Sequence, residues 1–245
     1  MAQSKKVALI TGANRGIGFE TAKQLGEQGV TVVLGSRKLS DAEAAAAKLK
    51  SAGTHAYGIQ LDVTKAADRT AAYKFIEEHF GKLDILVNNA GIAAGDFFTN
   101  TTSKTTEDEL KSVYETNFFS VVGLTQQLLP LIKKSDAGRI VNLSSILGSL
   151  ALHADPKSPI AGSKLFSYNS SKAALNAFTI HLADELRNTP IKVNSVHPGW
   201  VETEMGTDAA PMEIPDGAKT SVELALLGSD GPNGRFIHMG QELPW

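Results

Sequence analysis

The 245-residue sequence predicts a doubly wound α/β fold in a single domain, with a parallel sheet covered by helices on both faces. Two observations favour this class. Short apolar strand candidates alternate with segments of helical period, and the first strand candidate runs into a glycine-rich turn that opens a helix. Hydrophobic residues make up 42% of the chain, which is enough for a full core in a domain of this length.

The strand candidates are short runs rich in apolar residues, a pattern typical of strands buried on both faces. They are Val7–Ile10, Val30–Leu34, His55–Leu61, Leu83–Val87, Arg139–Leu143, Ile191–Val196 and Phe236–Met239. Helices are predicted between them at Phe19–Gln28, Ala44–Lys50, Ala66–Phe80, Glu107–Lys133 and Tyr168–Leu186. Capping boxes at Ser40–Glu43 and Thr106–Glu109 indicate two helix starts, and Pro130 is expected to bend the longest helix near its end.

The turn after the first strand carries three spaced glycines. Gly12 permits a tight turn, Gly16 lets the backbone approach a pyrophosphate, and Gly18 lets the helix pack against the strand. Backbone N–H groups at the helix start would then face the phosphates of a dinucleotide. The predicted binding residues are Gly12, Asn14, Arg15, Gly16, Ile17 and Gly18. The spacing G-x-x-x-G-x-G differs from the common G-x-G-x-x-G, and a glycine cluster alone can also be an ordinary loop.

The second strand candidate leads into positions 35–38, where an NAD site usually carries Asp or Glu for the ribose hydroxyls. This chain has no acid there and offers Ser36, Arg37 and Lys38, with Arg15 as a further cation in the glycine turn. Because arginine grips phosphate through two N–H groups, we predict that Arg15, Ser36 and Arg37 bind the 2′-phosphate of NADP(H). The alternative is that Arg37 and Lys38 are solvated charges at a helix entry.

Tyr168 and Lys172 stand four positions apart in a predicted helix, so their side chains project from one face. A free phenol has a pKa near 10 and transfers protons poorly at neutral pH. A nearby cation favours the phenolate, so we expect Lys172 to lower the pKa of Tyr168. The pair is typical of a proton-transfer site, although the same spacing also arises by chance on helix surfaces.

Further motifs follow in order along nearly the whole chain: Asp62 and Val63, Asn88-Asn89-Ala90-Gly91, Asn117, Ser144-Ser145 and Pro198-Gly199. Together with the glycine turn and Tyr168-x-x-x-Lys172, they resemble the short-chain dehydrogenase/reductase family. The segment Pro198–Thr203 resembles NADPH-dependent carbonyl reductases in particular. The resemblance implies a Rossmann-type fold and an NADP(H)-dependent oxidoreductase.

The resemblance also implies roles for the matched residues. Tyr168 is expected to be the general acid that protonates a carbonyl oxygen, or the base in the reverse direction, and Lys172 to bind the nicotinamide ribose. Ser145 is expected to hydrogen-bond the substrate oxygen, and Asn117 to hold a water that relays protons from Lys172 to solvent. The other residues expected along the cofactor are Asp62, Val63, Asn88, Ala90, Gly91, Pro198, Gly199, Val201 and Thr203.

Structural alternatives stay open for several of these residues. Asp62 could cap the helix that follows it, and Asn88 and Asn89 could be turn residues at a strand end. Asn117 could satisfy backbone groups within its own helix. Ser144 is expected to be structural.

The interval between Ser145 and Tyr168 is longer than in compact members of the family. Its extra stretch, about residues 150–166, contains two prolines and Gly162, which oppose a continuous helix. We expect an irregular excursion over the active-site mouth, where carbonyl-reductase-like relatives carry a longer insertion. It either shapes the substrate pocket or alters packing against a partner subunit.

Predicted loops at residues 93–98, 146–167 and 200–215 are expected to form the substrate pocket. Phe97, Phe98, Trp200 and Met205 suggest an apolar lining, although these side chains could equally be packing residues. Residues 93–105 and 202–215 are the segments expected to be mobile, and the second could close over substrate.

Composition excludes several classes of function. A net charge of −2 argues against a nucleic-acid binder, and the absence of cysteine excludes disulfides and thiolate catalysis. No apolar run approaches the length of a membrane span, and the run that starts at Val7 is too short for a signal peptide. The six histidines show no metal-ligand spacing, so no metal site is predicted. A cytoplasmic location is expected.

These observations predict an NADPH-dependent reductase of a small-molecule aldehyde or ketone, reversible with the alcohol. One alternative is an alcohol dehydrogenase that works mainly in oxidation. Another is a non-catalytic nucleotide-sensing protein, although the intact Ser145, Tyr168 and Lys172 argue against it. Relatives often pair through the helices that hold Asn117 and Tyr168, so a homodimer or homotetramer is expected unless the insertion caps that surface.

Overall fold

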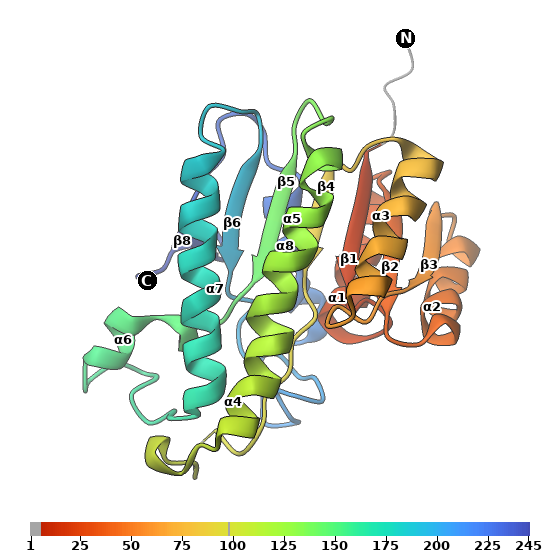
Figure 1. Cartoon of the computed structure of the whole chain (residues 1–245). Coiled ribbons are helices and arrows are strands. Elements are labelled where there is room, and N and C mark those ends of the chain that lie inside the picture. The colour runs from red at the N-terminus through yellow and green to blue at the C-terminus, as the bar shows by residue number, and fades with distance from the viewer. Residues whose placement is uncertain (1–5, 98) are drawn as a thin grey trace.

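The structure, a computed structural model, describes residues 6–97 and 99–245. These residues form one eight-stranded sheet and the helices around it (Figure 1). Phe98, expected in the substrate pocket, lies outside the described residues. The strands are β1 (Val7–Thr11), β2 (Thr31–Ser36), β3 (Ala56–Gln60), β4 (Ile85–Asn88), β5 (Arg139–Leu143), β6 (Lys192–Val196), β7 (Phe236–His238) and β8 (Gln241–Glu242). Their order is β3-β2-β1-β4-β5-β6-β7-β8, and only the β7–β8 pair is antiparallel. The predicted doubly wound α/β class is confirmed, whereas β8 was not predicted.

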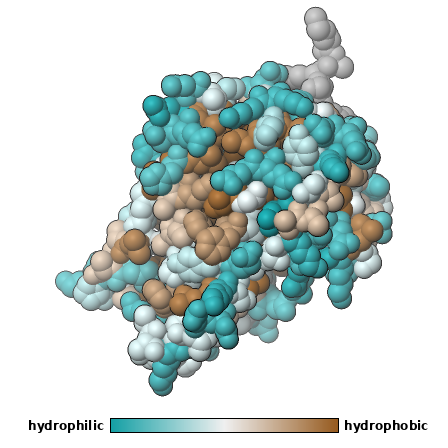
Figure 2. Space-filling view, in the orientation of Figure 1, coloured by the Kyte–Doolittle hydropathy of each residue, from teal (hydrophilic) through white to brown (hydrophobic). Residues whose placement is uncertain are grey.

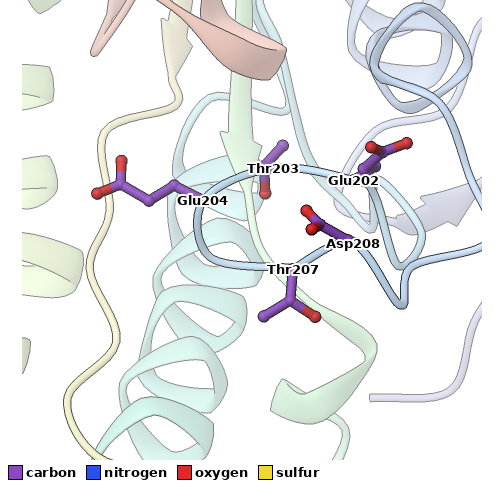
Figure 3. Close-up of a pocket in the computed structure, with 5 residues that line it drawn as sticks. All are labelled: Glu202, Thr203, Glu204, Thr207 and Asp208. Atoms are coloured by element: carbon purple, nitrogen blue, oxygen red, sulfur yellow. The ribbon is translucent and has the colours of Figure 1, made fainter.

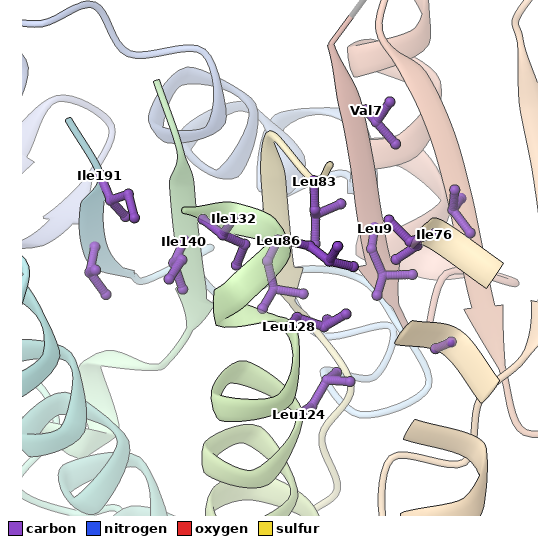
Figure 4. Packing of buried hydrophobic residues seen from close by; sticks show 14 of the residues in the cluster. Val7, Leu9, Ile76, Leu83, Leu86, Leu124, Leu128, Ile132, Ile140 and Ile191 are labelled. Atoms are coloured by element: carbon purple, nitrogen blue, oxygen red, sulfur yellow. The ribbon is translucent and has the colours of Figure 1, made fainter. Parts of the chain in front are cut away.

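Helices cover both faces of the sheet (Figure 1). On one face lie α3 (Ala66–Phe80), α5 (Ser120–Ile132) and α7 (Phe166–Glu185), and on the other α1 (Gly16–Glu27), α2 (Leu39–Ser51) and α8 (Ile214–Ala225). Because successive side chains of a strand point to opposite faces, β1 contributes to two cores. Val7 and Leu9 pack with Ile76 of α3 and Leu124 of α5 (Figure 4), whereas Ile10 packs on the other side.

The two predicted capping boxes have different outcomes. Thr106 accepts a hydrogen bond from the Glu109 N–H at 3.2 Å and caps α4 (Glu107–Tyr114), as predicted. The Ser40–Glu43 box is wrong as a helix start. Helix α2 begins one residue before Ser40, its N-cap is Lys38, and no side chain caps it. Helix α2 therefore begins closer to β2 than the capping box indicated.

The long helix predicted over residues 107–133 is not one regular helix. Between α4 and α5 lies a π-helical segment, η2 (Glu115–Phe119), which contains Asn117. Helix α5 then continues through Pro130 to Ile132. A π segment adds one residue to a helical turn, and such segments often occur at functional sites.

The segment between β5 and α7 is partly helical. It begins with a 3₁₀ turn, η3 (Ile146–Gly148), and the insertion that follows contains a short helix, α6 (Leu150–Ala154), before an irregular stretch that leads into α7. The expected irregular excursion is therefore correct only beyond Ala154. The Ala151 N–H donates to the Trp245 carbonyl at 2.9 Å, so α6 also contacts the far end of the sequence.

Two further helical elements were not predicted: η1 (Thr102–Lys104) and α8. Helix α8 carries Pro215 and Gly217 in its first turn, and these two residues concealed it in the sequence. Proline at the first helical positions nevertheless favours a helix start, because its missing N–H would be unpaired there anyway.

The chain segments expected to carry function leave the carboxyl ends of neighbouring strands. The strand order reverses between β1 and β4, and ligands of open α/β sheets bind in the crevice at such a point. The glycine turn follows β1, and Ala90 and Gly91 follow β4. No helix in the described part of the chain is long and apolar enough to cross a membrane.

Candidate active site

The glycine turn after β1 has the backbone that a tight approach to phosphate requires. Gly12 and Gly16 have φ of +62° and +58°, where residues with a β-carbon are strained. A β-carbon on Gly18 would lie 2.4 Å from Asn89 Nδ2 and 2.5 Å from the Gly12 carbonyl oxygen. Only glycine therefore lets α1 pack this closely on the turn. Helix α1 has no side-chain cap and no acid in its first turn, so its N–H groups suit an anion.

Asn89 fixes the glycine turn to the loop after β4. Its Nδ2 donates to the carbonyl oxygens of Thr11 at 2.8 Å and Gly12 at 3.1 Å. In return, Thr11 Oγ1 accepts from the N–H groups of Asn89 and Ala90, both at 2.9 Å. The sequence suggested only a turn residue at position 89, because its partners lie 78 positions away. The two sides of the crevice are thus held at a fixed spacing.

The Asn88 side chain is not at the crevice, contrary to its expected place along the cofactor. It is buried, and its Nδ2 donates to Asn142 Oδ1 at 2.9 Å and to Thr125 Oγ1 at 3.1 Å. These bonds join β4 to β5 and α5. Ala90 and Gly91 of the same motif lie beside the glycine turn and Lys172. A β-carbon on Gly12 would be 3.1 Å from Ala90 Cα, and one on Gly91 would be 3.5 Å from Lys172 Nζ.

The end of β2 brings charges of both signs together. Ser36 is buried, Arg37 is exposed, and the Ala13 N–H donates to the Gly35 carbonyl at 3.0 Å, which holds the glycine turn beside this strand end. Burial tends to raise the pKa of Asp62. Hydrogen bonds from Thr64 and the charges of Lys65 and Arg37 outweigh it and lower that pKa below its ordinary value.

Asp62 does not cap α3, although capping was the structural alternative. Its Oδ1 accepts from the Thr64 N–H at 3.1 Å and the Thr64 hydroxyl at 2.7 Å, and the N-cap of α3 is Lys65. Val63 is buried next to it. Asp62 is therefore held at the strand end by a local turn, with Arg37 close by.

The predicted catalytic side chains converge from three elements. Tyr168 and Lys172 come from one face of α7, Ser145 follows β5, and Asn117 lies in η2; all four are buried. Ser145 hydrogen-bonds the Tyr168 hydroxyl. Lys172 Nζ lies 5.5 Å from the centre of the Tyr168 ring and donates to the Leu143 carbonyl at 2.7 Å. The spacing argument for a shared face is confirmed.

The pKa of Tyr168 is raised in this structure, whereas the sequence predicted that it would be lowered. Burial raises the pKa of Tyr168 to about 12, and the hydrogen bond with Ser145 only partly opposes the shift. Burial also lowers the pKa of Lys172 to about 8. The ammonium points at a backbone carbonyl rather than at the phenol oxygen, so loss of solvent dominates both side chains.

Asn117 connects η2 to the loop after β4 and to α7. Its Oδ1 accepts from the Ile92 N–H, and its Nδ2 donates to the Ile92 carbonyl, both at 2.8 Å. The second N–H of Nδ2 donates to Ser171 Oγ at 3.0 Å. Asn117 thus satisfies backbone groups of a neighbouring loop and not of its own helix. Both amide N–H groups are used, and one lone pair of Oδ1 remains for a further donor.

The insertion and the segment after β4 meet beside Tyr168. The Phe97 ring packs edge-on against the Tyr168 ring, with centroids 5.4 Å apart. The Lys164 N–H donates to the Phe97 carbonyl at 3.3 Å, which joins the two segments. Phe97, one of the side chains suggested for an apolar pocket lining, thus packs on the phenol ring. Ser144 is structural as predicted, since its hydroxyl donates to the Lys172 carbonyl on α7 at 3.4 Å.

The loop after β6 borders an open hollow of about 480 Å³ (Figure 3). It is lined by Glu202, Thr203, Glu204, Thr207 and Asp208. The lining is polar and acidic, and Trp200 and Met205 are exposed elsewhere on the loop. Pro198 and Gly199 lead from β6 into this loop, and Val201 is buried. Thr203 lies close to the glycine turn, since a β-carbon on Gly16 would be 3.9 Å from Thr203 Cγ2.

Comparison with known proteins agrees with this arrangement. Residues 6–214, which include the glycine turn, the four candidate catalytic residues and the loop after β6, match the short chain dehydrogenase family. The chain belongs to this family. Salutaridine reductase from Papaver somniferum, a relative, is 34% identical to this short chain dehydrogenase in an alignment that covers 95% of the chain and 94% of the relative.

Solved structures of family members superpose over nearly the whole molecule. The structure of salutaridine reductase from Papaver somniferum aligns with a TM-score of 0.82 and 31% identity, covering 95% of this short chain dehydrogenase and 99% of the solved chain. NADPH-bound carbonyl reductase from chicken fatty liver aligns with a TM-score of 0.85 and 29% identity, covering 99% and 100%. The sheet and the layout of the crevice are therefore shared with reductases.

Proposed function

We propose that this short chain dehydrogenase reduces the carbonyl group of an aldehyde or ketone with NADPH, and that Tyr168 donates the proton. One observation carries the proposal. The Tyr168 hydroxyl is hydrogen-bonded to Ser145 and shares a helix face with Lys172, at the strand edge where the glycine turn lies. The NADPH-bound relative from chicken supports the choice of cofactor.

The residues at the crevice fit NADP(H). The first turn of α1, with Asn14, Gly16 and Ile17 half-buried at its start, would hold the pyrophosphate. Arg15 and Arg37 would hold the 2′-phosphate, because positions 35–38 carry no acid to bind a ribose diol. Asp62, Val63, Ala90 and Gly91 would border the adenosine and ribose, and Pro198, Gly199, Val201 and Thr203 the nicotinamide. When bound, NADPH supplies the hydride.

The protein's part in the reaction is to hold the substrate oxygen and to supply a proton. Ser145 would hydrogen-bond the carbonyl oxygen and stabilise negative charge as it develops there. With its pKa raised to about 12, Tyr168 would be protonated at neutral pH, and its proton would pass to the more basic oxygen that develops on the substrate. The Lys172 ammonium would stabilise the phenolate left behind, and the free lone pair of Asn117 Oδ1 would order a water for reprotonation.

The direction of the reaction would depend on which cofactor pool the protein meets. In oxidation Tyr168 would have to accept a proton as phenolate, and burial makes the phenolate scarce at neutral pH. The reaction is reversible in principle, and alcohol oxidation would gain as the pH rises.

A second copy of the chain is the proposed macromolecular partner. Apolar side chains gather over α5 and α7 (Figure 2), and Phe119 and Ile180 are exposed there. Exposed apolar patches of this kind are typical of protein interfaces. The insertion leaves these two side chains in solvent, which favours a homodimer or homotetramer over a monomer. Light scattering would measure the mass, and a monomer at micromolar concentration would contradict this part of the proposal.

The decisive experiment follows nicotinamide absorbance while the protein is incubated with NADPH and a panel of ketones and aldehydes. Tyr168→Phe is the matched variant, because it removes one hydroxyl and keeps the buried ring. We expect turnover to fall by about 10²–10⁴-fold while NADPH still binds. A non-catalytic nucleotide-sensing protein would bind NADPH but show no turnover, with or without the Tyr168→Phe substitution. A fully active Tyr168→Phe protein would refute the assigned mechanism.

A further inference from the structure

The loop after β6 is attached to the glycine turn by an ion pair. Arg15 Nη2 contacts Glu204 Oε2, and both side chains are largely exposed. The backbones are close as well, because a β-carbon on Gly16 would lie only 3.9 Å from Thr203 Cγ2. Glu204 thus reaches from the nicotinamide side of the crevice to a cation of the phosphate-binding turn.

The loop that presents Glu204 is held in shape by its own bonds. Trp200 Nε1 donates to the Gly206 carbonyl at 2.7 Å, and the Gly206 N–H donates to Thr203 Oγ1 at 3.1 Å. The Glu202 N–H donates to the Met212 carbonyl at 2.8 Å. In Figure 3 the Glu204 side chain extends away from the other acids of the loop. Its direction toward Arg15 is therefore set by the fold of the loop.

Arg15 has a second possible partner on the other side of the crevice. Arg15 is the N-cap of α1. It stands two residues after Ala13, whose N–H donates to the Gly35 carbonyl at the end of β2. The proposed 2′-phosphate site lies at that strand end, with Ser36 and Arg37. While Arg15 Nη2 is paired with Glu204, its N–H group toward the carboxylate is not free for a phosphate. NADPH carries a dianion at this position, whereas NADH carries a hydroxyl.

We propose that Glu204 lowers the preference of this enzyme for NADPH over NADH through its ion pair with Arg15. Glu204 holds the guanidinium in an ion pair that the 2′-phosphate of NADPH must break, which weakens NADPH binding and leaves NADH binding unchanged. The proposal rests on the function proposed above. Exposed ion pairs are weak, so release of Arg15 is expected to tighten NADPH binding by roughly two- to fivefold.

The test is a set of dissociation constants for NADPH and NADH, measured by fluorescence titration at low ionic strength. The variants are Glu204→Gln, Arg15→Gln and the double substitution, with Glu202→Gln as the matched control. Glu202→Gln removes the same charge from the same loop without touching the ion pair. We expect Glu204→Gln to raise the NADPH-to-NADH affinity ratio by roughly two- to fivefold, Glu202→Gln to leave it unchanged, and Glu204→Gln to have no effect beside Arg15→Gln.

Three other outcomes would overturn the inference. Equal gains from Glu204→Gln and Glu202→Gln would mean that the loop acts only through its general negative charge. A gain that persists beside Arg15→Gln would mean that Glu204 repels the cofactor directly. No change in the ratio with Glu204→Gln would mean that the ion pair does not compete with the 2′-phosphate for Arg15. Failure of the unsubstituted protein to bind NADPH would instead refute the proposed function itself.

Discussion

Lys172 is buried, and loss of solvent lowers the pKa of its ammonium from 10.5 to about 8. The side chain is therefore charged below pH 8 and becomes neutral as the pH rises through that value. In the proposed mechanism the charge would stabilise the phenolate that Tyr168 leaves after it donates its proton. We expect the rate of carbonyl reduction to stay level from about pH 6 to 8 and then to fall by roughly tenfold per pH unit. Initial rates with saturating NADPH over this pH range would measure it.

The control for this pH effect is Lys172→Met, which has a similar length and no titratable group. Its activity should be low and should show no decline above pH 8. Tyr168 cannot cause the decline, because its pKa of about 12 keeps it protonated over this range. A rate that stayed level up to pH 10 in the unsubstituted protein would contradict the assignment.

The residues that the sequence revealed are those whose partners are close along the chain. Tyr168 and Lys172 share a helix face through a four-residue spacing, and the glycine turn is visible from its own spacing. Asn117 was indicated only by family resemblance, and its bond to Ile92, 25 positions away, could not be seen. The sign of the Tyr168 pKa shift was missed for the same reason, since burial depends on the whole fold.

At the scale of elements, the 3₁₀ turn η3 carries the next prediction, because it packs directly on α7 at Lys172. A β-carbon on Gly148 would lie 2.8 Å from the Lys172 carbonyl carbon and 2.9 Å from its Cβ. Gly148→Ala should push η3 away from α7 and separate Ser145 from Tyr168. We expect a loss of about 1–3 kcal/mol in unfolding free energy and a roughly 10- to 100-fold drop in kcat. Urea unfolding and steady-state kinetics would measure both.

The insertion that follows η3 offers a matched control at Gly162. A β-carbon there would meet no atom within 4 Å, and the backbone is not in the left-handed region. Gly162→Ala should change the unfolding free energy by less than about 0.5 kcal/mol and leave kcat unaltered. Equal effects at the two glycines would show that contact between η3 and α7 does not position Ser145.

Element boundaries were predictable where propensity and tertiary contacts agree. Helix α3 and strand β5 have the predicted bounds, because their apolar pattern matches the face that they bury. The π segment η2 is different. Its sequence continues the helical pattern, and the extra residue is fixed by contacts of Asn117 with another loop. Helix α8 was concealed by its own first turn.

At the scale of the whole molecule, the candidate active site and a buried arginine that joins several segments lie at opposite ends of the strands. The carboxyl ends of the strands carry the crevice. At the amino end, Arg139 opens β5 and donates to backbone carbonyls of Gly138, Pro190, Leu227 and Gly228. Its guanidinium is buried, and burial lowers its pKa from the ordinary value. One side chain thus joins the start of β5 to two connecting segments.

The Arg139→Ala variant tests whether stability can be lowered at one end of the sheet without changing turnover at the other. It leaves several buried carbonyls without a donor, so we expect the unfolding free energy to fall by about 3 kcal/mol. The crevice is at the other end of the strands, so kcat of the folded variant should stay within about twofold of the unsubstituted value. Arg187→Ala, which removes an exposed ion pair with Asp184, should cost less than about 1 kcal/mol. Urea unfolding and turnover measured on the same samples would decide, and a loss of kcat that matched the loss of stability would show that the two ends of the sheet are coupled.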